Sequence, residues 1–388
     1  MNLFSLAGRM VAPERPPIML DAKRCTHSHN KFSNCDACVS ACPVGALRLD
    51  KTITLDEKAC AACGACLPVC PVGALSGADG VHDLVNCIAR VPELDVIELI
   101  CARHAAADDG PAETTAAIRA DGCLAALGPA AYVWMLAGET RQVLVRLDAC
   151  AGCSWGKVQA QITQTLQHVN LLTSARGETG RVVALEARRV DWVSRPVISA
   201  KNPPLTRRDL FRAFVSEGPK IAAQVLPFEE SSVPEDKAPP LERRRLLSAI
   251  KRFGAERVSI APDNGLGLVQ LAVCKKCTAC GVCARVCPTG AMRYAAHGDN
   301  FRLNVLPGAC TDCGACLSVC APEALRRDGA PMVGDLVGAE ALVLRTDALR
   351  TCVKCGAKYA GETTGDLCSV CRFRQENPFS ARLPVKRA

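Results

Sequence analysis

The sequence is poor in aromatic residues and in histidine. Phe, Trp and Tyr together make up 4% of its 388 residues, and it contains 6 histidines. Proteins that bind single-stranded nucleic acid stack bases on aromatic side chains, so this scarcity argues against such a function. The net charge of +8, from 47 Lys and Arg against 39 Asp and Glu, indicates partners only weakly. We therefore predict no nucleic-acid partner.

Long apolar runs are also lacking. The residues before Arg9 contain no hydrophobic stretch of the length found in a secretory signal peptide. The longest uncharged stretch, 122–138, is interrupted by Gly128 and Pro129 and is short for a membrane span. We therefore predict no transmembrane segment and a reducing, cytoplasmic location.

Motifs of substrate chemistry are missing as well. The sequence contains no G-x-x-x-x-G-K-[ST] phosphate loop and no G-x-G-x-x-G after a predicted strand. It also contains no C-x-x-x-C-x-x-C of the radical-SAM kind and no C-x-x-C-H haem attachment site. We therefore assign no catalytic residue.

Cysteine, by contrast, is abundant, with 26 residues in the chain. In a small secreted protein such a number would indicate disulfides, but this chain is long and groups its cysteines in C-x-x-C runs. The length fits two to four domains, and 49% apolar and 22% charged residues are typical of a folded globular protein. The grouped cysteines predict metal ligation.

One cysteine motif occurs four times, in two pairs. The copies cover 35–47, 60–75, 277–292 and 310–325. The second copy reads CAACGACLPVCPVGAL and the third CTACGVCARVCPTGAM, so residues beyond the cysteines recur as well. We therefore predict two copies of one module, one towards each end of the chain.

Each full copy has the spacing C-x-x-C-x-x-C-x-x-x-C, usually followed by Pro. Three cysteines at intervals of three wrap one cubane, and the fourth ligates the neighbouring cluster, which is the signature of bacterial two-cluster ferredoxins. Residues 25–75 and 274–325 thus resemble 2(4Fe-4S) ferredoxins. This resemblance implies four 4Fe-4S clusters and a function in electron transfer.

The family pattern also implies how the cysteines divide among the four clusters. For the N-terminal module the implied sets are Cys60, Cys63 and Cys66 with Cys42, and Cys35, Cys38 and Cys70 with Cys25. For the C-terminal module they are Cys277, Cys280 and Cys283 with Cys320, and Cys310, Cys313 and Cys316 with Cys287.

The first copy departs from the pattern because Phe32 stands where a cysteine is expected. We interpret Cys25, reached by a loop seven residues longer, as the missing ligand, with His27 or His29 as alternatives. A 3Fe or labile cluster is a further alternative for this site.

The C-terminal copies carry two smaller departures. Ala321 separates Cys320 from Pro322, which should alter the local geometry more than the ligation. Cys274 precedes Cys277 by three residues, so a ligand set shifted by one cysteine, beginning at Cys274, is an alternative. We interpret Cys274 instead as a buried or spare thiol.

Between the modules the pattern predicts a small α/β layer in which cysteines follow strands. Strands are predicted over 95–100, 143–147 and 181–185, and helices over 129–136 and 157–169. In a parallel sheet the carboxyl ends of the strands share one edge, where ligands bind. The thiols that we expect to converge there are Cys101, Cys123, Cys150 and Cys153.

These four thiols predict a further cluster, 2Fe-2S in preference to 4Fe-4S. Residues 94–170 look like the small iron-sulfur subunit of methyl-viologen-reducing hydrogenase complexes. The alternative is a buried cysteine or two beside a C-x-x-C that is a dithiol or a second zinc knuckle. Cys87, in an apolar helical context, is interpreted as a structural thiol.

The last cysteines form two facing knuckles. Cys352-x-x-Cys355 is followed by Cys368-x-x-Cys371, which is the spacing of a zinc ribbon. Zinc is favoured over a rubredoxin-type iron because the segment lacks the Pro and aromatic residues that resemble rubredoxin. Four thiolates would close the coordination sphere, which predicts a structural role.

A run of basic residues precedes the second module. Arg243, Arg244, Arg245, Lys251 and Arg252 predict a basic helical face. We interpret this face as solvated, and an acidic redox partner could dock on it.

The predicted fold class is α+β with an α/β middle: two ferredoxin-like dicluster modules flank a small α/β domain, and a zinc ribbon follows. The expected segments are a first module at 1–80, the α/β domain at 81–200, a helical linker at 201–255, a second module at 256–335 and the ribbon at 336–388. The predicted function is an iron-sulfur electron carrier, a relay subunit that passes electrons to partner proteins in a larger anaerobic oxidoreductase. The alternative is a redox enzyme acting on a thiol, disulfide or small substrate at the central cysteines.

Overall fold

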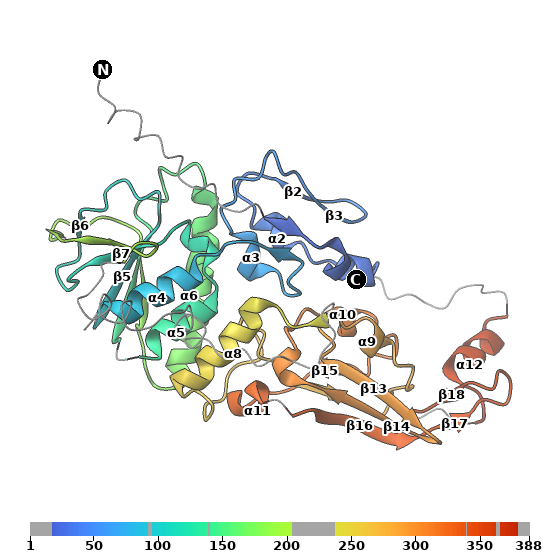
Figure 1. The fold of residues 1–388 in the computed structure, drawn as a ribbon. Helices are drawn as coiled ribbons and strands as arrows, with labels where there is room; N and C mark the ends of the chain where they lie inside the picture. The colour runs from blue at the N-terminus through green and yellow to red at the C-terminus, as the bar shows by residue number, and fades with distance from the viewer. Residues whose placement is uncertain are drawn as a thin grey trace, which may run out of the picture.

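The computed structural model describes residues 18–91, 95–138, 140–203, 237–338, 340–361 and 365–378. They form a cysteine-rich module near each end, a domain built on a parallel sheet, and a small four-cysteine segment (Figure 1). No described helix has the length and hydrophobicity of a membrane span. Most of the predicted linker at 201–255 lies outside the described residues, which resume at Lys237.

The N-terminal module holds its cysteines with short elements. Two antiparallel strand pairs, β1 with β4 and β2 with β3, accompany three one-turn helices. Their bounds are β1 (Met19–Leu20), α1 (Thr26–His29), α2 (Ala37–Ser40), β2 (Leu47–Leu49), β3 (Ile53–Leu55), α3 (Cys66–Val69) and β4 (Leu75–Ser76). With so little regular structure, the cysteines themselves make up much of the module's interior.

The C-terminal module repeats this arrangement with longer strands. β12 pairs with β15 as β1 does with β4, and β13 with β14 as β2 does with β3. The bounds are β12 (Leu271–Val273), α9 (Val282–Arg285), β13 (Met292–His297), β14 (Asn300–Val305), α10 (Ala315–Ser318), β15 (Leu325–Arg327), α11 (Val333–Val337) and β16 (Leu342–Ala348). Because β16 pairs with β14, this module extends beyond the predicted boundary at residue 335.

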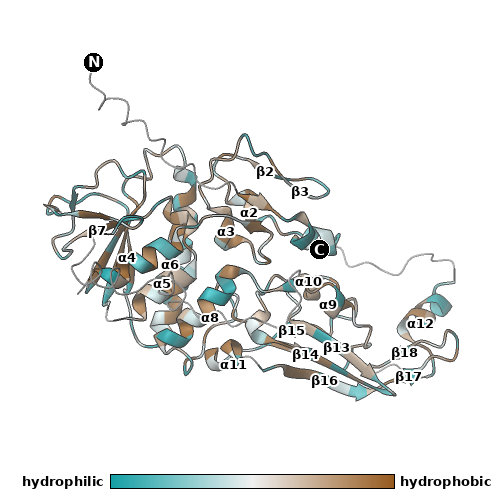
Figure 2. Ribbon diagram, in the orientation of Figure 1, coloured by the Kyte–Doolittle hydropathy of each residue, from teal (hydrophilic) through white to brown (hydrophobic). Residues whose placement is uncertain are grey.

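The middle domain is built on a five-stranded sheet in the order β11-β7-β5-β8-β9, and every neighbouring pair is parallel. The strands are β5 (Val96–Ile100), β7 (Ala117–Arg119), β8 (Gln142–Arg146), β9 (Val182–Leu185) and β11 (Val197–Ser199). All of β5 is buried, since Ile97 and Leu99 face the main core and the alternate residues face the other side of the sheet. The hydrophobic colour of these strands is visible in Figure 2.

Helices α4 (Val81–Arg90), α5 (Pro129–Leu136) and α6 (Gln159–Ala175) contribute to the same main core. Helix α5 begins and ends where the sequence predicts, with Gly128 as its N-cap and Pro129 as its first residue. Helix α6 continues six residues beyond the predicted end at Val169. Cys87 on α4 is fully buried in this core, in keeping with a structural thiol.

Helix α8 (Leu241–Phe253) joins the three parts of the molecule and is not a linker. Leu246 and Ile250 are buried in the main core, and the helix carries both hydrophilic and hydrophobic residues (Figure 2). The buried Arg243 guanidinium donates hydrogen bonds to the carbonyl oxygens of Pro307 at 3.0 Å and Gly308 at 3.1 Å in the C-terminal module.

The expectation of one solvated basic face on this helix is therefore wrong. Arg243 is buried against backbone carbonyls, and Arg245 forms an ion pair with Asp79. Arg252 lies over the ring of Trp134, 5.2 Å from its centroid. Successive helical residues point about 100° apart, so neighbours in the run meet different surroundings.

Glu242 fastens α8 to the domain with the parallel sheet. Its carboxylate accepts a hydrogen bond of 2.8 Å from the backbone N–H of Ala130, at the start of α5. A Cβ atom at Gly128 would lie 2.2 Å from this carboxylate, so a larger residue there would displace the Glu242 side chain from its hydrogen bond. Desolvation raises the pKa of Glu242 to about 7.

Replacing Glu242 by glutamine is expected to change how stability depends on pH. Because its pKa is raised in the folded state, the folded protein binds a proton between about pH 4.5 and pH 7 that the unfolded chain releases. The wild type should therefore lose stability relative to Glu242→Gln as the pH rises through this window. Anaerobic urea unfolding of both proteins measures the difference; a gap that stays constant with pH would contradict the assignment.

The two cysteine-rich modules contact each other. The side chain of Asn30 donates a hydrogen bond of 2.8 Å to the hydroxyl of Ser318, and Cys313 packs against the core of the N-terminal module. The predicted arrangement, with one module on each side of the α/β domain, is therefore corrected. The N-terminal module contacts both of the other parts.

Candidate iron-sulfur and metal sites

Site N1 consists of Cys25, Cys35, Cys38 and Cys70. The four thiols line one hollow together with apolar side chains such as Leu49, and no carboxylate lies in its lining. Burial, and then the neighbouring thiols of Cys70 and Cys35, raise the pKa of Cys38 to about 12. Neighbouring thiols that raise the pKa values of Cys25 and Cys38 form a set of ligands that a cation would stabilise.

Cys25 occupies the place left open by Phe32. It precedes α1, and its thiol lies close enough to Cys70 and Cys35 for both to raise its pKa, after burial. His27 forms a hydrogen bond of 2.8 Å with the carbonyl oxygen of Cys35 through Nε2. His29 is exposed and is absent from the lining of the hollow. This placement favours Cys25 over either histidine.

Site N2 consists of Cys42, Cys60, Cys63 and Cys66. Burial raises the pKa of Cys66 to about 12, and the thiols of Cys63 and Cys42 add to this shift. Burial also raises the pKa of Cys63, and the thiols of Cys42 and Cys60 add to this shift. The structure thus brings together the four cysteines that the family pattern grouped.

In the C-terminal module, site C1 consists of Cys287, Cys310, Cys313 and Cys316, and site C2 of Cys277, Cys280, Cys283 and Cys320. Each set lines its own hollow. Burial raises the pKa of Cys313 and of Cys283 to about 12, with further contributions from thiols of the same site. Cys274 lies outside the lining of C2, and its carbonyl oxygen accepts a hydrogen bond of 2.6 Å from Arg345. This placement favours the unshifted ligand set.

The loops that carry these cysteines share an unusual backbone conformation. In three copies the residue before the second cysteine has a positive φ although it is not glycine: Ala62 at 48°, Ala279 at 56° and Asp312 at 53°. A left-handed residue costs roughly 1–2 kcal/mol, so a tight wrap around a central group explains why it recurs. In the first copy, helix α2 begins at this position instead. This is also the copy in which Cys25 is interpreted as the ligand in place of Phe32.

The turn after the fourth cysteine is conserved in shape among the copies. Gly45, Gly73 and Gly290 have φ of 66°, 64° and 63°, and in the last copy Glu323 takes this place with φ of 50°. Ala321 stands in the place of the proline of the other copies and leaves the turn unchanged, while a glutamate occupies a position where glycine is preferred. Sequence inspection missed Glu323 because the shifted proline hid its alignment.

Backbone amides point at the sulfur atoms. The N–H groups of Ala46, Ala74 and Met292 donate to the Sγ atoms of Cys42 at 3.3 Å, Cys70 at 3.2 Å and Cys287 at 3.4 Å. Such donors stabilise thiolates and tune the reduction potential of a bound cluster. Four thiols, an apolar lining and amide donors together fit 4Fe-4S clusters.

The central site consists of Cys101, Cys123, Cys150 and Cys153, which line one hollow together with Arg103. Cys101 follows β5, and Cys150 and Cys153 follow β8, which is its neighbour in the parallel sheet. The carboxyl ends of the two strands thus bring together residues almost fifty positions apart. Burial raises the pKa of Cys123 to about 12, and the nearby thiols of Cys101 and Cys150 add to this shift.

A buried ion network supports the loop of the central site. Arg146 donates to Glu98 at 2.9 Å and to Asp148 at 2.6 Å, and Glu98 also pairs with Arg195. Burial opposes ionisation of Asp148, but hydrogen bonds from Arg146 and His104 lower its pKa far below the usual range. Sequence inspection missed this network, although Glu98 and Arg146 are conspicuous as charges within apolar strands.

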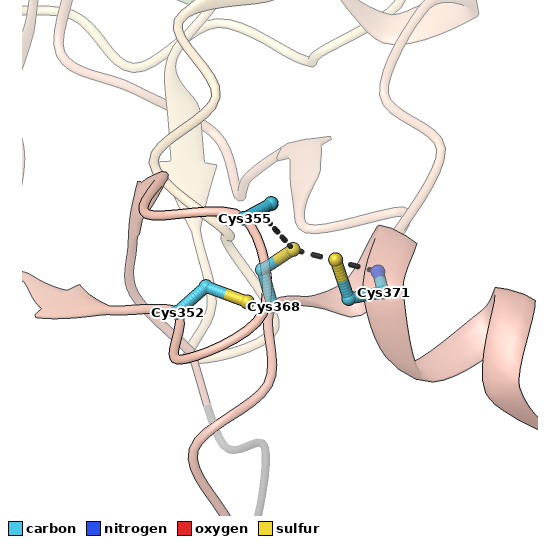
Figure 3. Close-up of side chains that lie close together, drawn as sticks. All are labelled: Cys352, Cys355, Cys368 and Cys371. Atoms are coloured by element: carbon cyan, nitrogen blue, oxygen red, sulfur yellow. Dashed lines mark hydrogen bonds between the residues drawn. The ribbon is translucent and has the colours of Figure 1, made fainter.

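The C-terminal site consists of Cys352, Cys355, Cys368 and Cys371, and we call it the knuckle site (Figure 3). Their Sγ atoms all lie within 4.8 Å of one another, and those of Cys355 and Cys368 are 3.8 Å apart. A tetrahedral Zn²⁺ with bonds of about 2.3 Å separates its sulfur ligands by roughly 3.8 Å. The geometry is thus compatible with zinc.

Short elements hold the knuckle site against site C2. The hairpin of β17 (Arg350–Thr351) and β18 (Lys358–Tyr359) carries the first cysteine pair, and α12 (Ser369–Glu376) begins in the second. The N–H of Ala360 donates a hydrogen bond of 3.2 Å to the carbonyl oxygen of Thr278, in the loop of Cys277. Hydrogen bonds from backbone amides lower the pKa of Cys352 to about 6, which favours its thiolate form.

Comparison with known proteins identifies the two modules. Residues 31–74 and 276–324 each match the family model of the 4Fe-4S dicluster domain. No curated protein and no solved structure matches the chain. The two matched segments contain all the cysteines of sites N2, C1 and C2 and three of those of N1, while Cys25 lies outside the first segment. The chain is therefore an iron-sulfur protein that carries two 4Fe-4S dicluster domains of the ferredoxin type.

Proposed function

We propose that the protein is an electron relay in which five clusters follow one another in the order central site, N2, N1, C1, C2. The observation that carries this proposal is that each site lies beside the next one. A 4Fe-4S cluster bound at each site would accept and pass on one electron. The chain's own residues hold the sites in line, bury them and supply hydrogen bonds to sulfur.

The first link joins the central site to N2. The thiol of Cys63 is near enough to contribute to the raised pKa of Cys123. A Cβ atom at Gly64 would lie 2.7 Å from the Cβ of Ala126, so the two cysteine loops are in tight contact. Gln161 on α6 bridges them by donating to the carbonyl oxygens of Ala65 at 2.8 Å and Ala125 at 3.2 Å.

The second link lies within the N-terminal module and the third between the modules. The thiol of Cys38 in N1 adds to the raised pKa of Cys66 in N2. Across the interface, Cys313 of C1 packs against the core of the N-terminal module, which contains thiols of both N1 and N2. Asn30, which lies between Cys25 and Cys35 in the chain, donates a hydrogen bond to Ser318, and this favours N1 as the neighbour of C1.

The last link lies within the C-terminal module. The thiol of Cys283 in C2 contributes to the raised pKa of Cys316 in C1. The relay thus has two ends, the central site and C2, and this favours a subunit that connects two partners in a larger oxidoreductase.

We propose a 4Fe-4S cluster for the central site as well, because its four thiols line a single hollow, as the four thiols of C2 and of N1 do.

Metal content of protein purified without oxygen tests the relay. Five 4Fe-4S clusters require about 20 iron and 20 sulfide per chain, a 2Fe-2S centre in the middle lowers this to about 18, and an empty central site to about 16. We expect about 20 iron, about one zinc at the knuckle site, and spin coupling between neighbouring clusters in EPR of the reduced protein. Iron far below 16 after reconstitution would refute the relay.

A further inference from the structure

One end of the relay is open to solvent. Of the sixteen cysteines in sites N1, N2, C1 and C2, Cys280 is the exposed one, and the others are half-buried or buried. It lies in a loop between Ala279 and Gly281, both of which have a positive φ, and Gly281 is the N-cap of α9. An edge of C2 therefore reaches the surface of the protein, where a partner can approach it closely.

Positive charges surround this exposed edge. Lys275, Lys276 and Arg285 are exposed, and none has a carboxylate partner in the described part of the chain. The Arg285 guanidinium lies 3.4 Å from where a Cβ on Gly281 would stand, so it is directly beside Cys280. We call Cys280 and these three cations the C2 face.

The carboxylate of Asp347, which pairs with Arg345, is already engaged. Arg345, whose charge acts on Cys277, pairs with Asp347 at 2.5 Å and also donates to the carbonyl oxygen of Cys274. The C2 face therefore keeps its positive charge. Thiolate-ligated clusters carry negative charge, and flanking cations offset the repulsion that an acidic partner would otherwise meet.

The knuckle site supports the basic loop. Gly361 packs against the backbone of the loop, where its Cβ would lie 3.3 Å from the carbonyl oxygen of Cys277 and 3.7 Å from that of Lys275. Ala360 donates to the carbonyl of Thr278 in the same loop. A metal that orders the knuckle site thus also orders the backbone from which Lys275 and Lys276 project.

We propose that the C2 face is the docking surface for a small acidic one-electron carrier protein. This inference rests on the proposed relay and names the partner at one of its ends. In the transfer step one electron leaves the reduced relay, which is oxidised, and the oxidised carrier is reduced by one electron. No covalent bond forms or breaks, and no proton moves. Complementary charge steers the carrier to C2 and holds the two centres close together.

Binding of a plant-type 2Fe-2S ferredoxin, an acidic carrier, to the iron-loaded full-length protein tests the proposal. The variant Lys275→Glu/Lys276→Glu/Arg285→Glu should raise the dissociation constant at least tenfold at low salt. The difference should shrink as salt is added, because exposed charges are screened. In the matched control, three exposed cations outside the C2 face, Arg189, Lys251 and Arg257, are replaced by glutamate. This control should bind the ferredoxin like the wild type.

A basic c-type cytochrome provides the converse probe. It should bind the triple variant more tightly than the wild type. The proposal is overturned if the triple variant binds the ferredoxin as the wild type does, or if the control loses as much affinity.

Iron content and dithionite reduction of the same samples distinguish a failure of the proposed docking surface from a failure of the proposed relay. If the clusters are present and reducible but affinity is unchanged, the docking surface is refuted and the relay stands. If iron is absent from the wild type, the relay itself fails. Should the triple variant lose iron, Lys275→Gln/Lys276→Gln provides the milder test, with a smaller loss of affinity expected.

Discussion

Replacing both Cys101 and Cys150 by serine is expected to lower the iron content from about 20 to about 16 per chain, with the four ferredoxin-type clusters retained. The reason is that these two thiols come from neighbouring strands and line the same hollow, so the central site is left with two cysteines. Anaerobic iron and sulfide analysis measures the loss. EPR of the reduced protein should lose one species together with its coupling to N2.

Cys274→Ser is the matched control for this double variant. Cys274 is equally a half-buried cysteine beside a cluster loop, but it lies outside the lining of C2, so its replacement should leave iron unchanged. A double variant that keeps all the iron of the wild type would remove the central site from the relay. A wild type with only about 16 iron and a reactive dithiol at Cys150 and Cys153 would favour the thiol or disulfide enzyme instead.

Replacing Arg243 by alanine is expected to lower the free energy of unfolding by roughly 3 kcal/mol and to loosen the C-terminal module from the rest. Burial lowers the pKa of Arg243 to about 10, but at neutral pH its guanidinium remains charged and satisfies the carbonyl oxygens of Pro307, Gly308 and Leu266. Truncation removes this donor from the carbonyl oxygens of Gly308 and Leu266, and Pro307 keeps only the N–H of Cys310 among the described residues. Anaerobic denaturant unfolding measures the stability, and EPR measures the coupling between N1 and C1.

Arg252→Ala on the same helix provides the comparison. Arg252 is exposed and lies over Trp134, so its loss should cost about 1 kcal/mol or less and should leave the coupling of N1 and C1 intact. Equal effects of the two variants would mean that the helix matters only as a hydrophobic element. Normal stability of Arg243→Ala would contradict the role given to its hydrogen bonds.

Local spacing was sufficient to predict which cysteines of one loop lie close together in the structure. Three cysteines at intervals of three stand in one loop, and no other part of the chain is needed to bring their thiols together. The start of α5 could also be predicted from neighbouring residues, because Gly128 and Pro129 supply the cap and the first helical position. The family match at 31–74 and 276–324 rests on the same local patterns.

The basic run on α8 illustrates what spacing could not predict. Arg243, Arg245 and Arg252 have similar sequence surroundings, yet one is buried against carbonyl groups, one pairs with Asp79 and one covers a tryptophan. The difference arises from what packs against each side of the helix. Those neighbours come from three distant parts of the chain.

The sequence by itself determined the type of chemistry, since the number and spacing of the cysteines specify thiolate ligation and two dicluster modules. The tertiary structure alone decided which parts of the chain lie beside one another. The α/β domain lies between the modules in the chain, but in space the N-terminal module contacts both other parts: Asn30 bonds to Ser318 of the C-terminal module, and Gln161 of the α/β domain bonds to the carbonyl oxygen of Ala65. Ligand spacing follows from the reach of a short loop, whereas the arrangement of these parts follows from which surfaces bury one another, and that depends on the whole folded chain.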